Sequence, residues 1–268
     1  MKAEEWDRAA PGWERQRERT QVFAGPVSRR MVELLRPQAS WTVLEVAAGP
    51  GETGFLAAGS VERLISTDYS PRMVEVARRR AAELDLQNVE LAVMDAQRID
   101  LPDGAVDGIL CRWGYMLVDD PAAALAEARR VLRPGGRLVF AIWAEAERNP
   151  WATILGRILV ERGHVEPPEP AAPGMFTLAD RELLEGLVRG AGFGDLSAED
   201  VELTAPYRDV DDFLGVQLDM AAQTGVIVQA LPAEEYEEVR AELARRFERF
   251  RSGEALLLPG VSRIVTAS

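Results

Sequence analysis

The sequence predicts an α/β fold built on a doubly wound, mostly parallel seven-stranded sheet with added helical segments. Between residues 41 and 143, five short and nearly continuous apolar runs alternate with helical patterns, as expected of strands covered on both faces. Two of the helical stretches begin with serine or aspartate followed by proline, which is typical of a capped helix start. This alternation implies right-handed crossovers and helices on both faces of the sheet.

Each of the first five strands is predicted from its own apolar run. They comprise residues 41–47, 61–67, 89–94, 106–113 and 136–143. Ser70 is the expected N-cap of the helix after the second strand, and Asp120 is the expected N-cap of the helix before the fifth. Pro134, Gly135 and Gly136 should end the latter helix.

The chain after residue 143 departs from strict alternation. It predicts a short helix, a proline-rich loop, an amphipathic helix, a strand, a helical insertion and a last strand, at residues 149–163, 164–174, 177–193, 195–207, 208–258 and 260–268. Thr177 is the expected cap of the amphipathic helix because an acidic residue follows three positions later. The insertion is interpreted as a substrate cap, as cover for a sheet edge, or as a subunit contact that would make a homodimer.

These elements divide the chain into three parts. Residues 1–36 form a helical lid segment, residues 37–205 with 259–268 form the sheet core, and residues 206–258 form the insertion. Residues 146–176 of the core are expected to contribute to the substrate cap.

The composition disfavours several classes of function. A net charge of −13 opposes attraction to nucleic acid or to an anionic membrane, and no apolar run approaches the length of a membrane-spanning helix. One cysteine, Cys111, and one histidine, His164, are present, so we expect neither disulfides nor a metal site. The prediction is a soluble, cytoplasmic protein with a small-molecule partner.

The stretch "VLEVAAGPGETGF" at residues 43–55 carries a glycine-rich loop between a strand and a helix. Its Gly49, Gly51 and Gly54 match the dinucleotide pattern G-x-G-x-x-G, and Asp68 follows 19 residues after Gly49. Small residues at such a turn let a backbone approach a ligand near a helix N-terminus. An NAD(P)-dependent oxidoreductase is therefore one interpretation.

Three acidic residues at strand ends favour a different ligand. Glu45 lies near the end of the first strand, where a buried carboxylate needs either a cationic ligand group or loop amides as partners. Asp68 ends the second strand and is suited to ribose hydroxyls, and Asp95 ends the third and, with the amide of Ala96, is suited to adenine. All should meet at the carboxyl edge of the sheet. Together they describe a ligand with a cationic end, a ribose and an adenine.

The chain resembles the class I S-adenosylmethionine-dependent methyltransferases, in the ubiquinone/menaquinone-biosynthesis-like, type 11 branch. The resemblance spans residues 41–145 and rests on "VLEVAAGPGETG", "STDYSPRMVEVAR", "VMDAQRIDLPDGAVDGILCRW" and "EARRVLRPGGRLVFAIW" in that order. It implies a Rossmann-like core, S-adenosylmethionine as cofactor, and methyl transfer to an O, N or C atom of a small molecule.

The resemblance also implies a set of cofactor contacts. The methionine part would meet Glu45, Ala47, Gly49 and Gly51, the ribose Asp68, the nucleoside Tyr69 and Met73, the adenine Asp95 and Ala96, and the sulfonium region Arg112 and Trp113. One residue departs from the family, which usually has glycine at the position of Ala47.

The acceptor side is less defined by the sequence. Because the donor carries its own electrophile, a catalytic base is optional. The candidate catalytic residues are His164, as a base or else a solvated surface histidine, and Tyr115. Tyr115 is expected either to contact the acceptor or to pack in the core, and Trp151 is expected near the acceptor. A non-catalytic regulatory protein that binds the cofactor remains an alternative.

Overall fold

The computed structural model describes residues 3–167, 174–220 and 222–268. Its strands are β1 (Thr42–Glu45), β2 (Arg63–Asp68), β3 (Val89–Val93), β4 (Val106–Arg112), β5 (Leu132–Trp143), β6 (Leu196–Tyr207), β7 (Arg251–Ser252) and β8 (Ala255–Ala267). They form one sheet in the order β3-β2-β1-β4-β5-β8-β6, with the two-residue β7 paired to β8. Strands β1 to β5 are parallel, and β8 is antiparallel to β5 and β6. The predicted fold class is confirmed.

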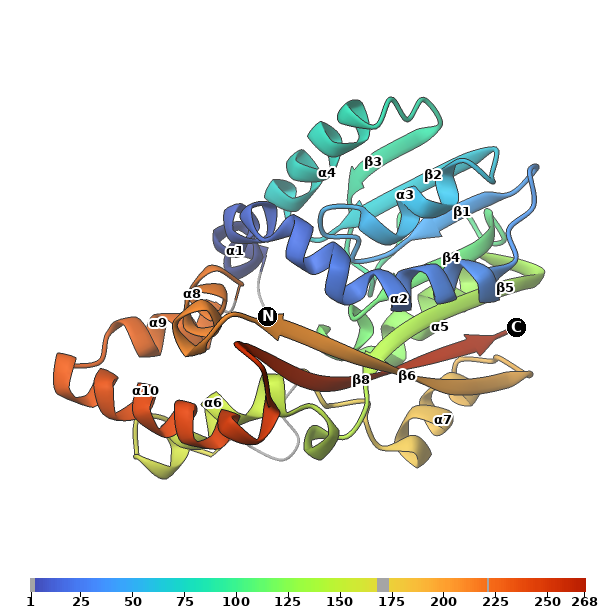
Figure 1. The fold of residues 1–268 in the computed structure, drawn as a ribbon. Coiled ribbons are helices and arrows are strands. Elements are labelled where there is room, and N and C mark those ends of the chain that lie inside the picture. Colours follow the sequence, from blue (N-terminus) through green and yellow to red (C-terminus); the bar gives the residue numbers. More distant parts are fainter. Residues whose placement is uncertain (1–2, 168–173, 221) are drawn as a thin grey trace.

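Helices cover both faces of this sheet, as Figure 1 shows. They are α1 (Ala3–Arg15), α2 (Arg17–Leu35), α3 (Glu52–Ala58), α4 (Pro71–Glu83), α5 (Pro121–Val131), α6 (Pro150–Glu161), α7 (Arg181–Gly190), α8 (Val210–Met220), α9 (Ala222–Gln229) and α10 (Ala233–Phe247), with 3₁₀ turns η1 (Tyr115–Leu117), η2 (Ala146–Arg148) and η3 (Glu248–Phe250). Helices α2 and α3 pack together on one face, and α5 and α7 pack together on the other. Among the described residues, no helix is both long and apolar enough to cross a membrane.

The helix starts confirm two predicted caps and correct the third. Ser70 accepts a hydrogen bond from the Met73 amide at 3.0 Å, and Asp120 accepts one from the Ala123 amide at 3.0 Å. The prediction for Thr177 is wrong, because α7 begins at Arg181 and its cap is Asp180. The acidic residue that suggested a capping box with Thr177 is itself the cap.

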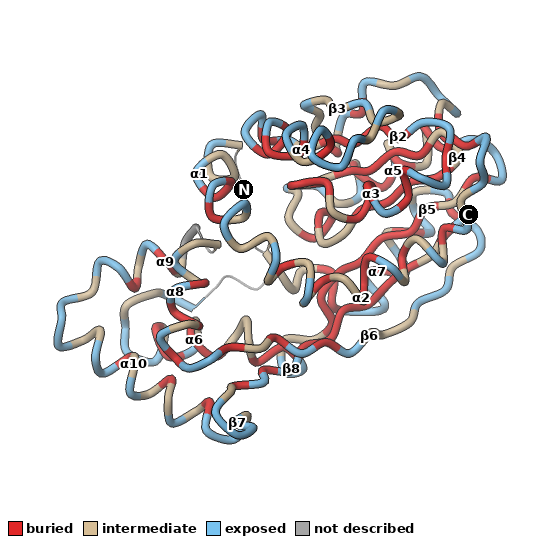
Figure 2. The backbone as a smooth tube through the Cα atoms, turned by 45° about the horizontal axis from the view of Figure 1, so that its top comes forward, coloured by how far each residue is buried: buried red, intermediate tan, exposed pale blue. Residues whose placement is uncertain are grey.

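Two large hydrophobic clusters divide the molecule. The first fills the space between the sheet and its helices. The second lies between α6, α8 and α10 and the outer ends of β6 and β8, and it includes Ile158, Phe213, Leu243 and Phe247. Figure 2 shows the buried strands of the first region and the more exposed helices of the second, which we call the cap. Of the proline-rich loop at 164–174, residues 168–173 lie outside the described residues.

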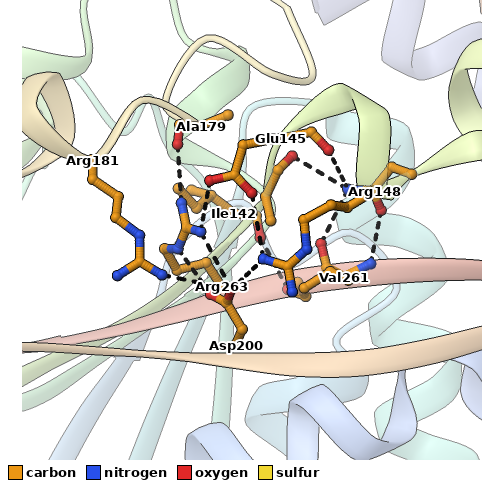
Figure 3. A network of polar contacts seen from close by, with 11 residues as sticks. Ile142, Glu145, Arg148, Ala179, Arg181, Asp200, Val261 and Arg263 are labelled. Carbon is orange, nitrogen blue, oxygen red and sulfur yellow. Dashed lines mark hydrogen bonds and ion pairs between the residues drawn. The ribbon is translucent and has the colours of Figure 1, made fainter.

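A buried arginine joins the sheet to the start of the cap (Figure 3). Arg263 of β8 is 0% exposed and donates hydrogen bonds to Asp200, to Glu145 and to the carbonyl of Ala179, each at 2.9 Å. Arg148 also contacts Asp200 and Glu145. A buried cation is tolerated only where such partners replace its hydration. The network therefore fixes the segment that leads from β5 into α6.

Candidate functional site

The three glycines of the loop after β1 have three different surroundings. Gly49 has φ of +55°, and a methyl group built on it would meet nothing within 4 Å. A methyl on Gly51 would lie 2.3 Å from the ring of Phe55, and one on Gly54 would lie 2.3 Å from Oε2 of Glu45. Gly51 and Gly54 thus serve internal packing, while the space beside Gly49 is open. A ligand at this edge would approach the backbone at Gly49.

Glu45 at the end of β1 fastens the glycine loop. Its side chain is 2% exposed, Oε1 accepts a hydrogen bond from the Gly54 amide at 2.7 Å, and Oε2 accepts one from the Ser66 hydroxyl at 2.9 Å. Burial raises the pKa of Glu45 to about 7, and the two hydrogen bonds and the charge of Arg112 oppose that rise. Of the two kinds of partner that the sequence allowed, the structure shows the loop amide.

Asp68 at the end of β2 holds the loop from the other side. Its Oδ2 accepts from the Gly49 amide at 2.8 Å and its Oδ1 from the Ser70 amide at 2.9 Å. Burial raises the pKa of Asp68, while hydrogen bonds from backbone amides act against the rise. Glu45 and Asp68 thus meet at the carboxyl edge of the sheet, as the parallel strand order requires.

Helix α1 covers the neighbouring start of α4. Asp7 accepts hydrogen bonds from the Ser70 hydroxyl and from the Arg72 amide, the latter at 3.1 Å. Below this contact, Met73 is 2% exposed and packs with Ala10 of α1. Met73 is therefore part of the packing between α1 and α4. The adjacent side chain of Tyr69 is 46% exposed.

Asp95 lies just beyond the end of β3, the strand that neighbours β2 on the side away from β1. Its Oδ1 accepts from the backbone amide of Gln97 at 2.9 Å and from the Gln97 side chain at 3.2 Å. The structure gives its Oδ2 no partner among the described residues. Ala96 is 8% exposed and joins the main core. The turn therefore presents one carboxylate oxygen at the same edge as Asp68.

An aromatic cluster lies at the carboxyl ends of β4 and β5. Trp113 stacks on Trp143 with ring centroids 4.1 Å apart, and Trp151 of α6 meets the Trp143 ring edge to face at 4.9 Å. Phe23 of α2 contacts the rings of all three tryptophans. Arg112 places its guanidinium over Trp113, with Cζ 4.7 Å from the ring centroid. The predicted Arg112, Trp113 and Trp151 are thus brought together.

Ala47 adopts the left-handed conformation that suits glycine, with φ of +51°. A methyl group built on Gly114 would lie 2.5 Å from the Cβ of Ala47. The side chain of Ala47 thus points at a position where the chain has glycine, and the two residues are complementary. This explains how the loop accommodates alanine.

The other two predicted acceptor-side residues lie elsewhere. Tyr115 is 0% exposed, meets Phe140 edge to face at 5.4 Å and belongs to the main core. This burial agrees with the packing alternative, in which the ring of Tyr115 fills the core beside the turn η1. His164 lies between α6 and α10, with Nδ1 3.4 Å from a carboxylate oxygen of Glu235.

Sequence reasoning missed three residues at this edge. Glu52 begins α3 and accepts a hydrogen bond from Gln21 of α2, and Phe23 completes the aromatic cluster. Asp7 reaches α4 from α1. Of these three residues, only Glu52 could have been found from the sequence, since it lies inside the glycine motif. The others depend on how α1 and α2 dock, which helical periodicity does not specify.

The chain is similar to known methyltransferases in sequence. A family model described as a methyltransferase domain matches residues 44–140. A ubiquinone/menaquinone biosynthesis C-methyltransferase of Acidiphilium cryptum is 33% identical over 184 residues, which cover 63% of this chain and 72% of that protein. An aklanonic acid methyltransferase of a Streptomyces species is 34% identical over 121 residues, which cover 44% of this chain and 55% of that protein.

A solved structure has the same fold. The YcgJ protein of Bacillus subtilis superposes with a TM-score of 0.61 over 90% of this chain and 96% of its own, at 19% sequence identity. At that identity the likeness concerns the arrangement of the sheet and helices alone.

Proposed function

The chain belongs to the class I S-adenosylmethionine-dependent methyltransferases, and we propose that it methylates an O, N or C atom of a planar small molecule. The observation that carries the proposal is the carboxyl edge of the sheet. There Asp68 holds the amide of Gly49, beside which the space is open, Asp95 follows the neighbouring strand β3, and the rings of Trp113 and Trp143 stack where β4 and β5 end.

On this proposal the nucleoside lies along the ends of β2 and β3. Asp68 accepts hydrogen bonds from the ribose hydroxyls, and the exposed ring of Tyr69 flanks the nucleoside. The adenine amine donates to the free Oδ2 of Asp95, and the amide of Ala96 donates to the ring. A carboxylate oxygen can accept more than one hydrogen bond, so Asp68 can bind ribose while it holds the Gly49 amide.

The acceptor lies against the half-buried rings of Phe23, Trp113 and Trp151, with the buried ring of Trp143 stacked on that of Trp113. These rings offer large, rigid apolar area with few rotatable bonds, and the names of two relatives, in quinone biosynthesis and on aklanonic acid, agree with a small-molecule acceptor. The bound cofactor supplies a methyl group already attached to a positively charged sulfur. The protein therefore has to orient the acceptor atom in line with that methyl and to exclude water.

Residues 1–36, 146–176 and 206–258 are proposed to close over the acceptor. Support comes from α1, which contacts both α4 of the core and α8 of the cap. We further place the protein in the cytoplasm, which agrees with its single cysteine. The net charge of −13 favours a small-molecule acceptor over a nucleic acid.

Calorimetry with S-adenosylmethionine, S-adenosylhomocysteine and NAD tests the cofactor. We expect both adenosyl compounds to bind and NAD not to bind; tight NAD binding without a response to S-adenosylhomocysteine would overturn the proposal. Asp68→Ala should weaken cofactor binding by about 1–3 kcal/mol, because ribose hydroxyls lose a charged acceptor. Asp195→Ala, which removes an exposed carboxylate before β6, serves as control and should leave affinity unchanged.

Transfer of a labelled methyl group to a panel of hydroxylated aromatic compounds tests catalysis. Trp151→Ala should lower the rate at limiting acceptor while the affinity for S-adenosylhomocysteine stays within about threefold of the wild type, since the ring belongs to the acceptor side. A protein that binds the cofactor but methylates no member of a broad metabolite extract would support the regulatory alternative.

A further inference from the structure

A hollow in the cap is lined almost entirely by arginines. It lies between α6, the end of α10 and η3, and it has a volume of about 290 Å³; α6 and α10 pack together, as Figure 1 shows. Its lining, which we call the arginine hollow, comprises Ile154, Arg157, Arg245, Arg246 and Arg249. The whole chain carries a net charge of −13, so four guanidinium groups around one hollow run against its composition.

The arginines of the hollow come from two separate parts of the chain. Arg245 and Arg246 end α10, and Arg249 follows in η3. The helix dipole favours cations in the last turn of α10, but it does not account for Arg157, which lies inside α6. One turn before it, Ile154 is 5% exposed and belongs to the hydrophobic cluster of the cap. The apolar packing of the cap therefore brings Arg157 to the same hollow as the arginines of α10.

Two glutamates neutralise part of this positive charge. Glu242 of α10 accepts a hydrogen bond from Nε of Arg246 at 2.6 Å and also pairs with Arg245. Glu161 of α6 accepts a hydrogen bond from a terminal nitrogen of the Arg246 guanidinium. Arg246 is thereby fixed between α6 and α10. Four arginines against two such glutamates leave an excess of positive charge at the hollow.

Arg157 and Arg249 are the arginines of the hollow with the weakest partners. A terminal nitrogen of Arg157 lies 3.7 Å from a carboxylate oxygen of Glu147, whose side chain is 77% exposed, and such surface pairs contribute little. Arg249 has its Cζ 4.6 Å from the centroid of the Phe250 ring and forms no ion pair within the described part of the chain. Both guanidinium groups therefore have hydrogen-bond donors available for a ligand.

We propose that the arginine hollow binds the phosphate group of a soluble small molecule. Arg157 and Arg249 donate to the phosphate oxygens, and Arg246 adds positive charge from its fixed position between the helices. Planar guanidinium donors match phosphate oxygens in pairs, and a phosphate monoester carries a charge of about −1.5 to −2 at neutral pH. The volume lies at the lower end of the roughly 300–1,000 Å³ typical of ligand pockets, which suits a single such group.

The charge of the whole protein favours a small ligand over a membrane or a nucleic acid. A net charge of −13 repels an extended polyanionic surface from the rest of the molecule. A small anion meets mainly the local field of the four arginines. The proposal goes beyond methyl transfer, because the hollow belongs to the cap and not to the carboxyl edge of the sheet.

Isothermal titration of the intact protein with phenyl phosphate tests the site, and benzoate is the matched compound with a carboxylate in place of the phosphate. We expect the wild type to bind one phenyl phosphate per chain, and benzoate at least about tenfold more weakly. Arg157→Gln and Arg249→Gln should each weaken phenyl phosphate binding at least about tenfold, as expected for a lost charge-assisted hydrogen bond. Arg208→Gln is the control, because this exposed arginine lies outside the hollow; its affinity should stay within about twofold of the wild type.

Glu161→Gln should have the opposite effect. It removes a carboxylate from the hollow and releases a donor of Arg246, so phenyl phosphate should bind about threefold more tightly. Misfolding does not produce tighter binding. For the arginine variants, an unchanged midpoint of thermal unfolding shows that each is folded.

Several outcomes would overturn the proposal. They are a wild type that binds no phenyl phosphate, equal affinities for phenyl phosphate and benzoate, or phenyl phosphate binding that neither arginine variant weakens. Sedimentation with phosphatidic acid vesicles through the same arginines, without binding of phenyl phosphate, would assign the hollow to a membrane surface and would also overturn it. No measurement here uses S-adenosylmethionine, so a failure would leave the proposed methyl transfer unaffected.

Discussion

The carboxyl edge of the sheet around Glu45, Gly49 and Asp68, here called the cofactor edge, is held together by other contacts than the cap. At the cofactor edge, carboxylates bind backbone amides, as Glu45 binds Gly54 and Asp68 binds Gly49. In the cap, rings and aliphatic side chains pack around Phe213, and exposed ion pairs such as Asp211 with Arg240 lie on the surface of the helices. Such surface pairs contribute little to stability.

This difference determines which substitutions each region tolerates. A backbone amide can be met only by a side chain of the right length at the right position, so one substitution at the cofactor edge breaks a specific contact. Apolar packing accepts many side chains of similar volume. The cofactor edge should therefore respond to changes in chemistry and conformation, and the cap should respond to changes in volume.

The largest expected effect tests whether the cap is a separate region. Phe213 is 0% exposed and meets the rings of Tyr207 and Phe247 at 5.1 and 4.9 Å. Phe213→Ala should lower the free energy of unfolding by about 3–5 kcal/mol, because it leaves a cavity. Denaturant titration measures the loss, and Leu218→Ala, at a partly exposed position of the same helix, is the milder control. At a temperature where the variant is folded, its affinity for S-adenosylhomocysteine should stay within about threefold of the wild type. An equal loss of stability and cofactor affinity would show that the two regions act as one.

The ionisation of Glu45 gives the cofactor edge a dependence on pH opposite in sign to that of the cap, where Arg240 lowers the pKa of Asp211. The pKa of Glu45 rises to about 7 in the folded protein from an ordinary value of 4.5, so the folded state binds its proton more tightly. The free energy of unfolding should therefore fall as pH rises from about 4.5 to 7, by roughly 3 kcal/mol from this group, and then level off. Glu45→Gln keeps an acceptor for Gly54 and a donor for Ser66 and cannot ionise. The difference between variant and wild type should grow in favour of the variant across that range. A constant difference would contradict the assignment.

The same contrast explains what the sequence could and could not predict. Glu45, Asp68 and Gly54 belong to one strand-turn-helix-strand unit, so their partners lie 9 and 19 residues away. Motif spacing and strand order were enough to bring them to one edge. The contact of Asp7 with Ser70 spans 63 residues, and amphipathic periodicity predicts helix α1 without fixing where it docks. The packing of Met73 against Ala10 of α1 could therefore not be predicted from the sequence.

Side-chain direction limited the prediction in two further places. Tyr115 follows a strand that ends at the correct edge, but the 3₁₀ turn after Gly114 rotates its ring into the core. For α7, both Thr177 and Asp180 are good N-cap residues, and only the observed hydrogen bond to the Leu183 amide decides between them. Propensity places a helix start within a few residues and does not fix it further.

The variant Gly54→Ala tests whether the cofactor edge requires a specific shape at this position. A methyl group there would lie 2.3 Å from Oε2 of Glu45, whereas one on Gly59, at the other end of α3, would meet nothing within 4 Å. Gly54→Ala should cost about 2–3 kcal/mol of unfolding free energy through overpacking against a buried carboxylate. Gly59→Ala should change it by less than about 0.5 kcal/mol. Similar values for the two variants would show that Glu45 moves aside without cost.

The smallest effect concerns Ala47 and Gly114, and it requires a double-mutant cycle. Gly114→Ala should cost about 1–2 kcal/mol, because the new methyl would lie 2.5 Å from the Cβ of Ala47 and 2.7 Å from the Sγ of Cys111. Ala47→Gly removes the first of these clashes and relieves a left-handed alanine with φ of +51°. In that background Gly114→Ala should therefore cost about 1 kcal/mol less, a coupling typical of residues in contact.

Gly156→Ala is the control for this cycle, since a methyl on that residue of α6 would meet nothing within 4 Å. Its effect should be the same whether residue 47 is alanine or glycine, because separated sites act additively. If Gly114→Ala also costs the same in both backgrounds, the methyl of Ala47 is not what requires glycine at position 114. In that case Cys111 alone sets the requirement, and alanine at position 47 is tolerated through flexibility of the loop. A measured coupling would instead show that residues 47 and 114 are matched in shape, in the same way as Glu45 and Gly54.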